Sequence, residues 1–554
     1  MKIWLLTFES TYTRKVGGLA EVPPRLGTAL KNKGHDVTII VPSHGFIKEH
    51  SKELEFIKKY RIRNRTIEIY MYSKPPVEHI IIGGDILEES EVYASEYLLE
   101  KIILWSIGLK LYAEYLLNNE GIIPDIVHAN DWHSVPGIVG LKSVYDMKGS
   151  RDYVGFYYQI HLLSRHYYPI EHLTYMIGVD PNKEVRGIYG WKTFREYYEL
   201  SHGYADRLGG LLSDKTLTVS REYIKEVVKR IGWDLIEHVD YIPNATTWKT
   251  EEIINNVLKI HETLKTYIRE LNDIISNRIN IRKYFLLEGL SKMSSEEPVI
   301  DDKDFKAFID KLDVPPFIGG GKIVPFKEEG PLAIITGRLA RQKGIHVFLK
   351  AVEEIIYRVP EAKFILLLLP VWGEKRLAEE LIEYTITMPD NIRVVFGRTK
   401  SIYQLAHLAT DIMIAPSIYE PFGLMALEAM SAGAPVVASK TGGLAETVID
   451  IIMNGVTGTG LHVIPGDPDD LADKTSDLLL FMETSNYEAW SREWKRVLER
   501  INNKALVEIL LSNPKAPELV RRSSIRRAMS YTWDKSAEKA LKIYMGAKND
   551  LQKI

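Results

Sequence analysis

The sequence predicts an α/β fold with two Rossmann-like, doubly wound domains. Short apolar runs that suit buried parallel strands alternate with stretches of helical periodicity, and this alternation occurs in two separate series. The first series begins at residues 2–8 and the second at 332–336. The 554 residues are also too many for a single hydrophobic core, so two or more domains are expected.

The first series opens with the order of a parallel strand–helix–strand unit. The apolar run 2–8 is followed by a loop that ends in Gly17-Gly18, by apolar residues at helical spacing up to residue 30, and by a second apolar run at 36–41. Further strands of this series are predicted at 67–72, 126–129, 152–160 and 216–219.

The second series repeats the alternation. A helix is predicted at 344–358, and the predicted strands are 332–336, 362–369, 392–396, 411–415 and 435–439. The Pro243-Asn244 turn interrupts the pattern between the two series. We therefore expect Rossmann-like domains at 1–248 and 330–525, and a last helix at 526–554 that packs back on the first domain.

The segment 249–329 between the domains is predicted to be an inserted, largely helical segment. It carries an amphipathic stripe made of Ile254, Val257, Leu258, His261, Leu264, Ile268, Leu271 and Ile275. Such a stripe either packs on its own domain or forms an interface with a partner or a second copy of the chain, and the sequence leaves both open. Pro315-Pro316 and Gly319-Gly320-Gly321 mark the exit loop.

Composition excludes several classes of protein. The 71 basic and 74 acidic residues give a formal net charge of −3, so there is no electrostatic reason to expect nucleic acid or an anionic membrane as a partner. The absence of cysteine excludes disulfides, thiolate chemistry and cysteine-ligated metals. No run approaches the roughly 18 apolar residues of a membrane span, and the first apolar run is too short for a signal peptide. We expect a cytoplasmic protein.

The scarcity of glutamine bears on the source of the protein. Only four glutamines occur, beside abundant Lys, Glu and Ile. Few heat-labile side chains and many charged ones are typical of thermophilic proteins, so a thermophilic source is predicted.

Two carboxylates dominate the most informative stretch, SIYEPFGLMALEAMSAGAPVVASKTGGLAETV. Glu420 is expected on the turn before a helix that starts at Pro421-Phe422-Gly423, with Glu428 two turns along that helix. Eight helical residues rise about 12 Å, so the two carboxylates would contact different parts of one ligand. Thr441-Gly442-Gly443-Leu444 offers backbone amides at a further helix start, where anions bind.

Two cationic motifs are candidates for binding a diphosphate. Arg338 and Lys343 lie five residues apart on the turn between strand 332–336 and the next helix, so both can face one anion. Lys15 precedes the paired glycines Gly17 and Gly18, whose amides can approach an anion closely. Taken alone, the first motif is compatible with a solvated surface pair and the second with an ordinary tight turn.

These motifs occur in the order found in a known family. Lys15-Val16-Gly17-Gly18-Leu19 resembles the KxGGL loop of bacterial and archaeal glycogen synthases and plant starch synthases, and residues 128–133 (HANDWH) resemble their HAHDWH segment. Residues 158–161, 203–207, 217–220 and 242–244 resemble further family segments. The resemblance covers most of the chain outside 249–329, and we identify the chain as similar to the archaeal type of glycogen synthase.

The resemblance implies a GT-B fold, in which two Rossmann-like domains face each other, and a retaining α-1,4-glucosyltransferase activity. The expected donor is ADP-glucose or UDP-glucose, and the expected acceptor is the non-reducing end of glycogen or a malto-oligosaccharide. The domain at 1–248 would be the acceptor side and that at 330–525 would bind the nucleotide-sugar. A homo-oligomer is left open.

The resemblance also implies the roles of individual residues. The expected catalytic set is His161, Glu420, Arg338 and Lys343. His161 would lie at the anomeric centre and the sugar C6 hydroxyl, Glu420 at the sugar, and the two cations at the leaving diphosphate. The expected donor-binding set is Lys15, Gly17, Gly18, Asp131, Trp132, Asn244, Arg398, Phe422, Gly423, Leu424, Glu428, Thr441, Gly442 and Gly443.

No cofactor and no metal are expected. The nearest approach to an acidic metal–diphosphate anchor is Asp301-Asp302-Lys303-Asp304, a run in the inserted segment that suits a solvated surface. The family is usually assigned a front-face path in which the leaving diphosphate deprotonates the acceptor, and basic groups can stabilise that diphosphate without a metal.

The sequence departs from the family pattern at several positions, and the departures at Asn130, residues 370–373 and Arg398 leave the choice of nucleotide base open. Asn130 replaces a histidine, and Ala245 replaces a glycine. Pro370-Val371-Trp372-Gly373 replaces a small glycine-rich turn, and Arg398 replaces an aromatic residue that stacks on the base in some members. We expect the Arg398 guanidinium to stack on the base instead. Sucrose-, trehalose- or lipid-directed transferases, a nucleotide-sugar epimerase and a non-catalytic glycan-binding scaffold remain alternatives.

Overall fold

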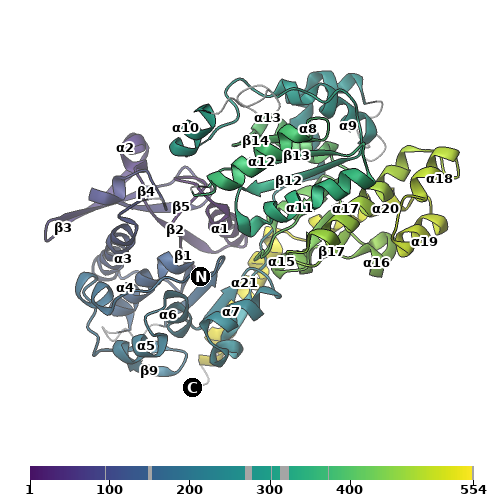
Figure 1. The fold of residues 1–554 in the computed structure, drawn as a ribbon. Coiled ribbons are helices and arrows are strands. Elements are labelled where there is room, and N and C mark those ends of the chain that lie inside the picture. Colours follow the sequence, from purple (N-terminus) through teal and green to yellow (C-terminus); the bar gives the residue numbers. More distant parts are fainter. Residues whose placement is uncertain are drawn as a thin grey trace. The chain divides into compact units, whose positions relative to one another are not determined.

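The computed structural model describes residues 1–93, 95–146, 153–268, 278–300, 302–311, 323–371 and 373–551 (Figure 1). The chain forms two compact units. Unit 1 comprises Met1–Asn244 and Thr532–Ile554, and unit 2 comprises Ala245–Tyr531. Within the described residues, no helix is both long enough and apolar enough to cross a lipid bilayer.

Unit 1 is built on a nine-stranded sheet in the order β11-β10-β7-β6-β1-β2-β5-β4-β3. Its strands are β1 (Lys2–Leu6), β2 (Asp36–Pro42), β3 (Glu55–Ile62), β4 (Arg65–Tyr72), β5 (Glu78–Gly83), β6 (Ile126–Asn130), β7 (Gly155–Ile160), β10 (Lys215–Thr218) and β11 (Val239–Tyr241). The pairs β3–β4 and β4–β5 are antiparallel and all the others are parallel. A separate hairpin joins β8 (Glu184–Gly187) and β9 (Gly190–Thr193).

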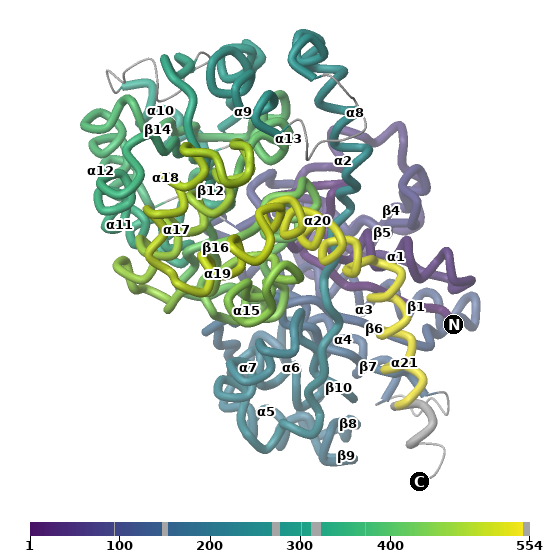
Figure 2. Tube along the Cα trace, turned by 90° about the vertical axis from the view of Figure 1, so that its right-hand side faces the viewer, coloured from purple at the N-terminus to yellow at the C-terminus, as the bar shows by residue number. Residues whose placement is uncertain are grey.

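The helices of unit 1 include the last one of the chain. They are α1 (Val22–Asn32), α2 (Phe46–His50), α3 (Leu98–Glu120), α4 (Val135–Tyr145), α5 (Phe194–Ser201), α6 (Ala205–Leu211), α7 (Tyr223–Ile231) and α21 (Trp533–Leu551). Figure 2 shows α21, in yellow, beside α1. Ala537, Ala540 and Tyr544 of α21 join the core around Ile3 and Leu26. Burial of these apolar surfaces fixes the end of the chain to unit 1.

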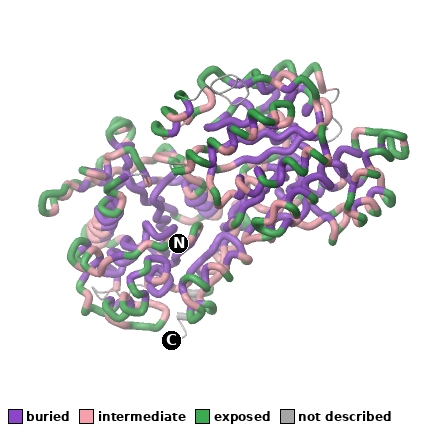
Figure 3. The backbone as a smooth tube through the Cα atoms, viewed as in Figure 1, coloured by how far each residue is buried: buried purple, intermediate pink, exposed green. Residues whose placement is uncertain are grey.

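Unit 2 is built on a six-stranded parallel sheet in the order β14-β13-β12-β15-β16-β17. Its strands are β12 (Leu332–Arg338), β13 (Lys363–Leu369), β14 (Ile392–Phe396), β15 (Ile412–Ala415), β16 (Val436–Ser439) and β17 (Gly460–Val463). The central strands of both sheets are mostly buried (Figure 3). Strands buried on both faces read as continuous apolar runs, which is why the sequence revealed them.

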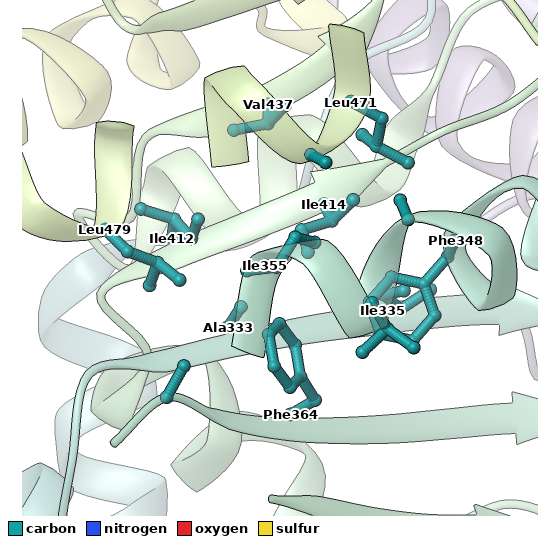
Figure 4. Close-up of a cluster of buried hydrophobic side chains, with 14 of the residues drawn as sticks. Ala333, Ile335, Phe348, Ile355, Phe364, Ile412, Ile414, Val437, Leu471 and Leu479 are labelled. Atoms are coloured by element: carbon teal, nitrogen blue, oxygen red, sulfur yellow. The ribbon is translucent and has the colours of Figure 1, made fainter. Parts of the chain in front are cut away.

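The helices of unit 2 surround this sheet. They are α8 (Thr250–Ile260), α9 (Arg278–Leu287), α10 (Lys303–Lys311), α11 (Ile345–Arg358), α12 (Lys375–Thr387), α13 (Lys400–Ala409), α14 (Leu424–Ser431), α15 (Gly442–Thr447), α16 (Ile451–Asn454), α17 (Pro468–Glu483), α18 (Arg492–Leu498), α19 (Lys504–Ser512) and α20 (Ala516–Met529). Phe348 and Ile355 of α11 pack on Ile335 and Phe364 of the sheet, and Leu471 and Leu479 of α17 belong to the same core (Figure 4).

The predicted long stripe of the segment 249–329 is interrupted. α8 ends at Ile260, and a short 3-10 turn follows at Glu262–Thr266. His261 is buried between them, where its ring contacts the carbonyl oxygen of Ser401 in α13 at 2.8 Å. This part of the stripe therefore packs on its own unit. Leu271, Ile275, Pro315-Pro316 and Gly319-Gly320-Gly321 lie outside the described residues.

Arginines of α9 tie the same segment to the sheet of unit 2. Arg282 lies 2.7 Å from Asp411 and 2.8 Å from Glu483, and Arg521 of α20 lies 2.9 Å from Asp411. All four side chains are buried. The two arginines keep the pKa of the Asp411 carboxyl below its ordinary value, although its burial alone would raise that pKa.

Candidate active site

The carboxyl edge of the sheet of unit 2 carries most of the predicted donor-binding residues. β12 has β13 on one side and β15 on the other, so the connections after β12 and β15 leave the sheet in opposite directions. Open α/β sheets bind ligands at such a switch point. The loop after β12 contains Lys343, and the loop after β15 contains Glu420.

These two loops are joined by an ion pair. The Nζ of Lys343 donates to Oε2 of Glu420, a carboxylate that is only 7% exposed and that also accepts a 3.3 Å bond from Ser417. Gly344 permits the close approach: its φ is +71°, and a Cβ there would lie 1.8 Å from the carbonyl oxygen of Pro416. The sequence assigned Lys343 and Glu420 to different parts of the donor, whereas the structure brings them into contact.

Glycines at the start of α15 pack this helix against the Glu420 turn. A Cβ on Gly442 would lie 2.1 Å from the Glu420 carbonyl oxygen, and one on Gly443 would lie 2.2 Å from Cα of Phe422. The Gly443 N–H donates to the Glu420 carbonyl at 2.9 Å. This amide is therefore engaged within the protein, and a phosphate would have to find its donors elsewhere on the turn.

The helix that follows Glu420 starts later than predicted. Gly423, with φ of +88°, precedes it, and α14 begins at Leu424, so Glu428 lies about one turn into the helix rather than two. The Glu428 carboxylate accepts a 2.9 Å bond from the hydroxyl of Tyr403 in α13. Phe422 is buried and meets the ring of Tyr531 edge-on, with centroids 5.8 Å apart.

Arg338 and Arg398 are exposed on this unit. Arg338 ends β12, and within the described residues it has no hydrogen-bond or ion-pair partner. The backbone of Arg398 pairs with Val299 through two hydrogen bonds of 2.9 and 3.0 Å. Thr441 stands in extended conformation directly before α15.

Arg527 of α20 contacts the C-terminal end of α15, the helix that begins at Gly442-Gly443. Its guanidinium donates to the carbonyl oxygens of Glu446 and Thr447 at 2.6 and 3.0 Å, where α15 ends. It also donates to the hydroxyl of Tyr531 at 2.9 Å. A cation at a helix C-terminus satisfies carbonyls that have no partner within the helix. Arg527 thereby holds α15 in place from the end opposite to Gly442.

The other predicted residues lie at the carboxyl edge of the sheet of unit 1, beside β1, where the strand order reverses. β6 ends in Asn130, and Asp131 follows with φ of +57°. The Asp131 carboxylate is buried and accepts the backbone N–H of His161 at 2.7 Å and that of Leu162 at 3.3 Å. Asn130 Oδ1 lies 2.9 Å from Nε2 of His161.

Burial shifts the titration of both residues toward their neutral forms. It raises the pKa of Asp131 to about 8, and the nearby Asp206 adds to this effect. It lowers the pKa of His161 to about 3. At neutral pH, His161 is therefore an uncharged imidazole.

In the KVGG loop (residues 15–18), two backbone N–H groups are already hydrogen-bonded to a side chain of the protein. The buried Glu9 carboxylate accepts the N–H groups of Val16 and Gly17 at 2.6 and 2.8 Å. Lys15 pairs with Glu21 at 2.5 Å. A donor phosphate that used Gly17 would have to displace Glu9. Gly18 is exposed, with open space where a Cβ would stand.

The remaining predicted residues of unit 1 are mostly buried. Trp132 is 8% exposed and stacks on the ring of His166. Asn244, the last residue before the chain enters unit 2, is 6% exposed, and its Oδ1 is buried without a hydrogen-bond partner within the described residues. A buried acceptor of this kind carries a desolvation cost unless a ligand satisfies it.

Sequence reasoning missed several residues that shape these edges. They are Glu9, Ser417, Tyr403, Asn130 as a partner of His161, and Arg527. Tyr403, Asn130 and Arg527 act through contacts with residues distant in the sequence, which no local pattern reveals, whereas Ser417 and Glu9 contact residues three to eight positions away. Asn130 alone carried a signal, because it departs from the family pattern.

Two family models match the chain. The starch synthase catalytic domain matches residues 2–239, and the glycosyl transferases group 1 model matches residues 322–492. The chain is 25% identical over 522 residues to the glycogen synthase of Acholeplasma laidlawii, covering 90% of this chain and 94% of that one. It is 24% identical over 525 residues to the glycogen synthase of Clostridium kluyveri, covering 91% and 97%. The chain belongs to the glycogen and starch synthase family.

A solved structure of this family agrees in fold. The catalytic domain of starch synthase IV from Arabidopsis thaliana, bound to ADP and acarbose, matches with a TM-score of 0.62 and 18% identity, covering 99% of each chain. The predicted fold class, with two Rossmann-like domains of GT-B type, is confirmed. The two family models fall on units 1 and 2 respectively.

Proposed function

We propose that this member of the family is a glycogen synthase, which transfers glucose with retention from ADP-glucose or UDP-glucose to the non-reducing end of an α-1,4-glucan. The observation that carries the proposal is the contact between Lys343 and Glu420 at the strand-order switch of unit 2, beside the glycine-packed start of α15. It combines a cation for a diphosphate with a carboxylate for sugar hydroxyls.

Departure of the diphosphate is the most demanding electrostatic step. Lys343 is held by Glu420, whereas Arg338 is exposed and has no ion-pair partner within the described residues. We propose that Arg338 and Lys343 stabilise the negative charge that grows on the leaving diphosphate. Side chains already in position cost no reorganisation at the moment of reaction. Lys15 and the exposed Gly18 of the KVGG loop in unit 1 are proposed as further donor-binding residues.

The groups of unit 1 are suited to the sugar. His161 is neutral at physiological pH, and Asp131 is buried without a cation beside it among the described residues. We propose that His161 contacts a hydroxyl of the transferred sugar and that Asp131 holds the main chain of His161. Trp132 and Asn244 are proposed as further sugar contacts. The groups that unit 1 is proposed to offer to the sugar would then be neutral dipoles.

The ribose and base are proposed to bind near Glu428, Phe422 and Arg398. Glu428, held by Tyr403, is proposed to accept from ribose hydroxyls. Arg398 is exposed at the end of β14 and is proposed to stack on the base. Replacement of Arg398 by alanine is expected to raise the KM for the nucleotide-sugar several-fold. An unchanged KM would contradict this role for Arg398.

One assay tests the proposal directly. The protein is incubated with ADP-glucose or UDP-glucose, with and without glycogen, and both nucleotide release and chain growth are measured. Release that depends on glucan and is accompanied by chain growth is expected. Release that is the same without glucan would refute a synthase and would indicate another use of the donor.

A further inference from the structure

We propose that Asn130 is a positioning residue that holds the His161 ring in one tautomer, with the proton on Nε2 and an open acceptor at Nδ1. The inference rests on the proposed function and deepens it, because it states how His161 meets the sugar. Three hydrogen bonds at the carboxyl ends of β1, β6 and β7 carry it.

The orientation of the Asn130 amide is fixed by its surroundings. Asn130 is 2% exposed, and its Nδ2 lies 2.9 Å from the carbonyl oxygen of Leu6 in β1. A carbonyl oxygen can only accept, so the amide nitrogen must face Leu6. The opposite orientation would bring two acceptors together and leave both without a proton. Oδ1 is therefore the atom that faces His161.

The tautomer of His161 follows from that orientation. Asn130 Oδ1 has no proton to give, so Nε2 of His161, 2.9 Å away, must be the donor. A neutral imidazole carries one N–H, which leaves a lone pair on Nδ1. No described residue hydrogen-bonds Nδ1, and Nδ1 is not among the fully buried polar atoms without a partner. It is open to accept from a ligand.

Consecutive residues thus hold both parts of His161. Asp131 accepts the backbone N–H of His161 at 2.7 Å, and Asn130 accepts the ring N–H. The family pattern has histidine at position 130, and a histidine can present either a donor or an acceptor to its neighbour. Asparagine whose nitrogen is committed to Leu6 presents only an acceptor. The departure at residue 130 therefore specifies the tautomer.

The fixed tautomer selects the chemistry of its ligand. An acceptor at Nδ1 binds a hydroxyl, which donates, and disfavours a carboxylate or a phosphate oxygen, which cannot. The ligand group at His161 is therefore a hydrogen-bond donor, such as a hydroxyl of the transferred sugar. A donor whose sugar carries a carboxylate at the same position would be rejected.

Nuclear magnetic resonance of the whole chain, with 15N-labelled histidine, tests the tautomer without any substrate. The shifts of the two ring nitrogens distinguish a protonated nitrogen from one with a lone pair, and a His161→Gln variant assigns the signal. We expect a single Nε2–H tautomer in the unmodified protein. A mixture, or a proton on Nδ1, would overturn the proposal without any variant.

The variant Asn130→Ala tests the consequence. It should give mixed tautomers of His161 and lower kcat by about 10-fold or more, with little change in the thermal midpoint. Asn130→His should recover part of the activity. His128→Gln is the matched control, because it changes a buried residue two positions earlier in β6 that does not hydrogen-bond His161. It should leave the His161 tautomer unchanged.

The outcomes separate the two proposals. If the unmodified protein shows the expected tautomer but transfers no glucose, the glycogen synthase proposal fails and the structural one stands. If the protein transfers glucose and Asn130→Ala keeps both its kcat and a single tautomer, Asn130 has no positioning role.

Discussion

The carboxyl edges of the two sheets carry polar residues in opposite electrostatic states. In unit 2 the edge is built around an ion pair, Lys343 with Glu420, and exposed Arg338 stands at the end of β12. In unit 1 the edge holds the buried Asp131 and the half-buried His161, and desolvation shifts the pKa of each toward its neutral form. The first edge suits a charged group, and the second suits hydroxyls.

The two carboxyl edges also differ in what fixes their loops in place. Unit 2 uses glycines, since Gly344, Gly442 and Gly443 all stand where a side chain would strike backbone atoms. Unit 1 uses side-chain hydrogen bonds, with Glu9 holding the KVGG loop and Asp131 holding residues 161–162. A loop held by a side chain can release it for a ligand, whereas a loop packed on glycine cannot change without moving the backbone.

The largest effect is expected when the charged edge loses its cation. Lys343→Ala removes the ion-pair partner of the buried Glu420, and we expect turnover to fall at least ~100-fold, because one charged contact in a closed site contributes about 2–4 kcal/mol. The measurement is kcat with saturating donor and glycogen. Lys350→Ala, on the exposed face of α11, is the control and should keep full activity. A fall in kcat of less than about 5-fold for Lys343→Ala would show that the unit 2 edge does not depend on this charge, and would contradict the contrast between the two edges.

The support behind the charged edge should matter less. Arg527→Ala removes two hydrogen bonds to the end of α15, and the donor KM is expected to rise about 10-fold, since each such bond contributes about 1 kcal/mol or somewhat less when water replaces it. Arg526 is exposed and donates only to Ser523 within the described residues, so Arg526→Ala should leave the KM unchanged. An equal donor KM for Arg527→Ala and Arg526→Ala would show that α15 needs no support from α20.

The sequence predicted the scaffold well because burial leaves a local signal. The predicted strands at 36–41, 126–129, 332–336 and 392–396 are confirmed as β2, β6, β12 and β14, and the helix at 344–358 is confirmed as α11. The strands it missed are different. β3 alternates mostly exposed with half-buried residues, and β17 has only four residues, so neither gives a continuous apolar run, whereas β5 was missed although its apolar residues are buried.

The site was predictable as a set of residues but not as a set of contacts. Motif order brought Lys343, Glu420 and His161 into the prediction, and their roles in catalysis stay predictions. The pairing of Lys343 with Glu420 and the Asn130–His161 bond each depend on distant loops meeting, and the bonds from the Val16 and Gly17 amides to Glu9 depend on how the loop after β1 folds back on itself. The predicted boundary before residue 526 falls inside α20, because the helix break is at Tyr531-Thr532 rather than earlier.

The smallest effect is expected at the neutral edge, as a change in how stability depends on pH. The pKa of Asp131 is about 8 in the folded protein and near 3.8 when unfolded. Between these values the folded chain holds a proton that the unfolded chain has lost, so stability falls as pH rises toward 8. Histidines with lowered pKa act in the opposite sense, but below about pH 6.5, where the unfolded chain would protonate them.

Above pH 7 the histidines no longer contribute, so the difference between the unmodified protein and Asp131→Asn from pH 7 to 9 reports on this carboxyl group. Asp131→Asn keeps an oxygen for the N–H groups of His161 and Leu162 but cannot ionise. Loss of this proton between pH 7 and 9 lowers the free energy of unfolding by about 1.4 kcal/mol, so we expect the thermal midpoint of the unmodified protein to fall by about 1–2 °C and that of Asp131→Asn to fall less. Asp180→Asn, an exposed aspartate of the same unit, should keep the slope of the unmodified protein. If Asp131→Asn also keeps that slope, Asp131 is ionised in the folded state, and the electrostatic contrast between the two edges disappears.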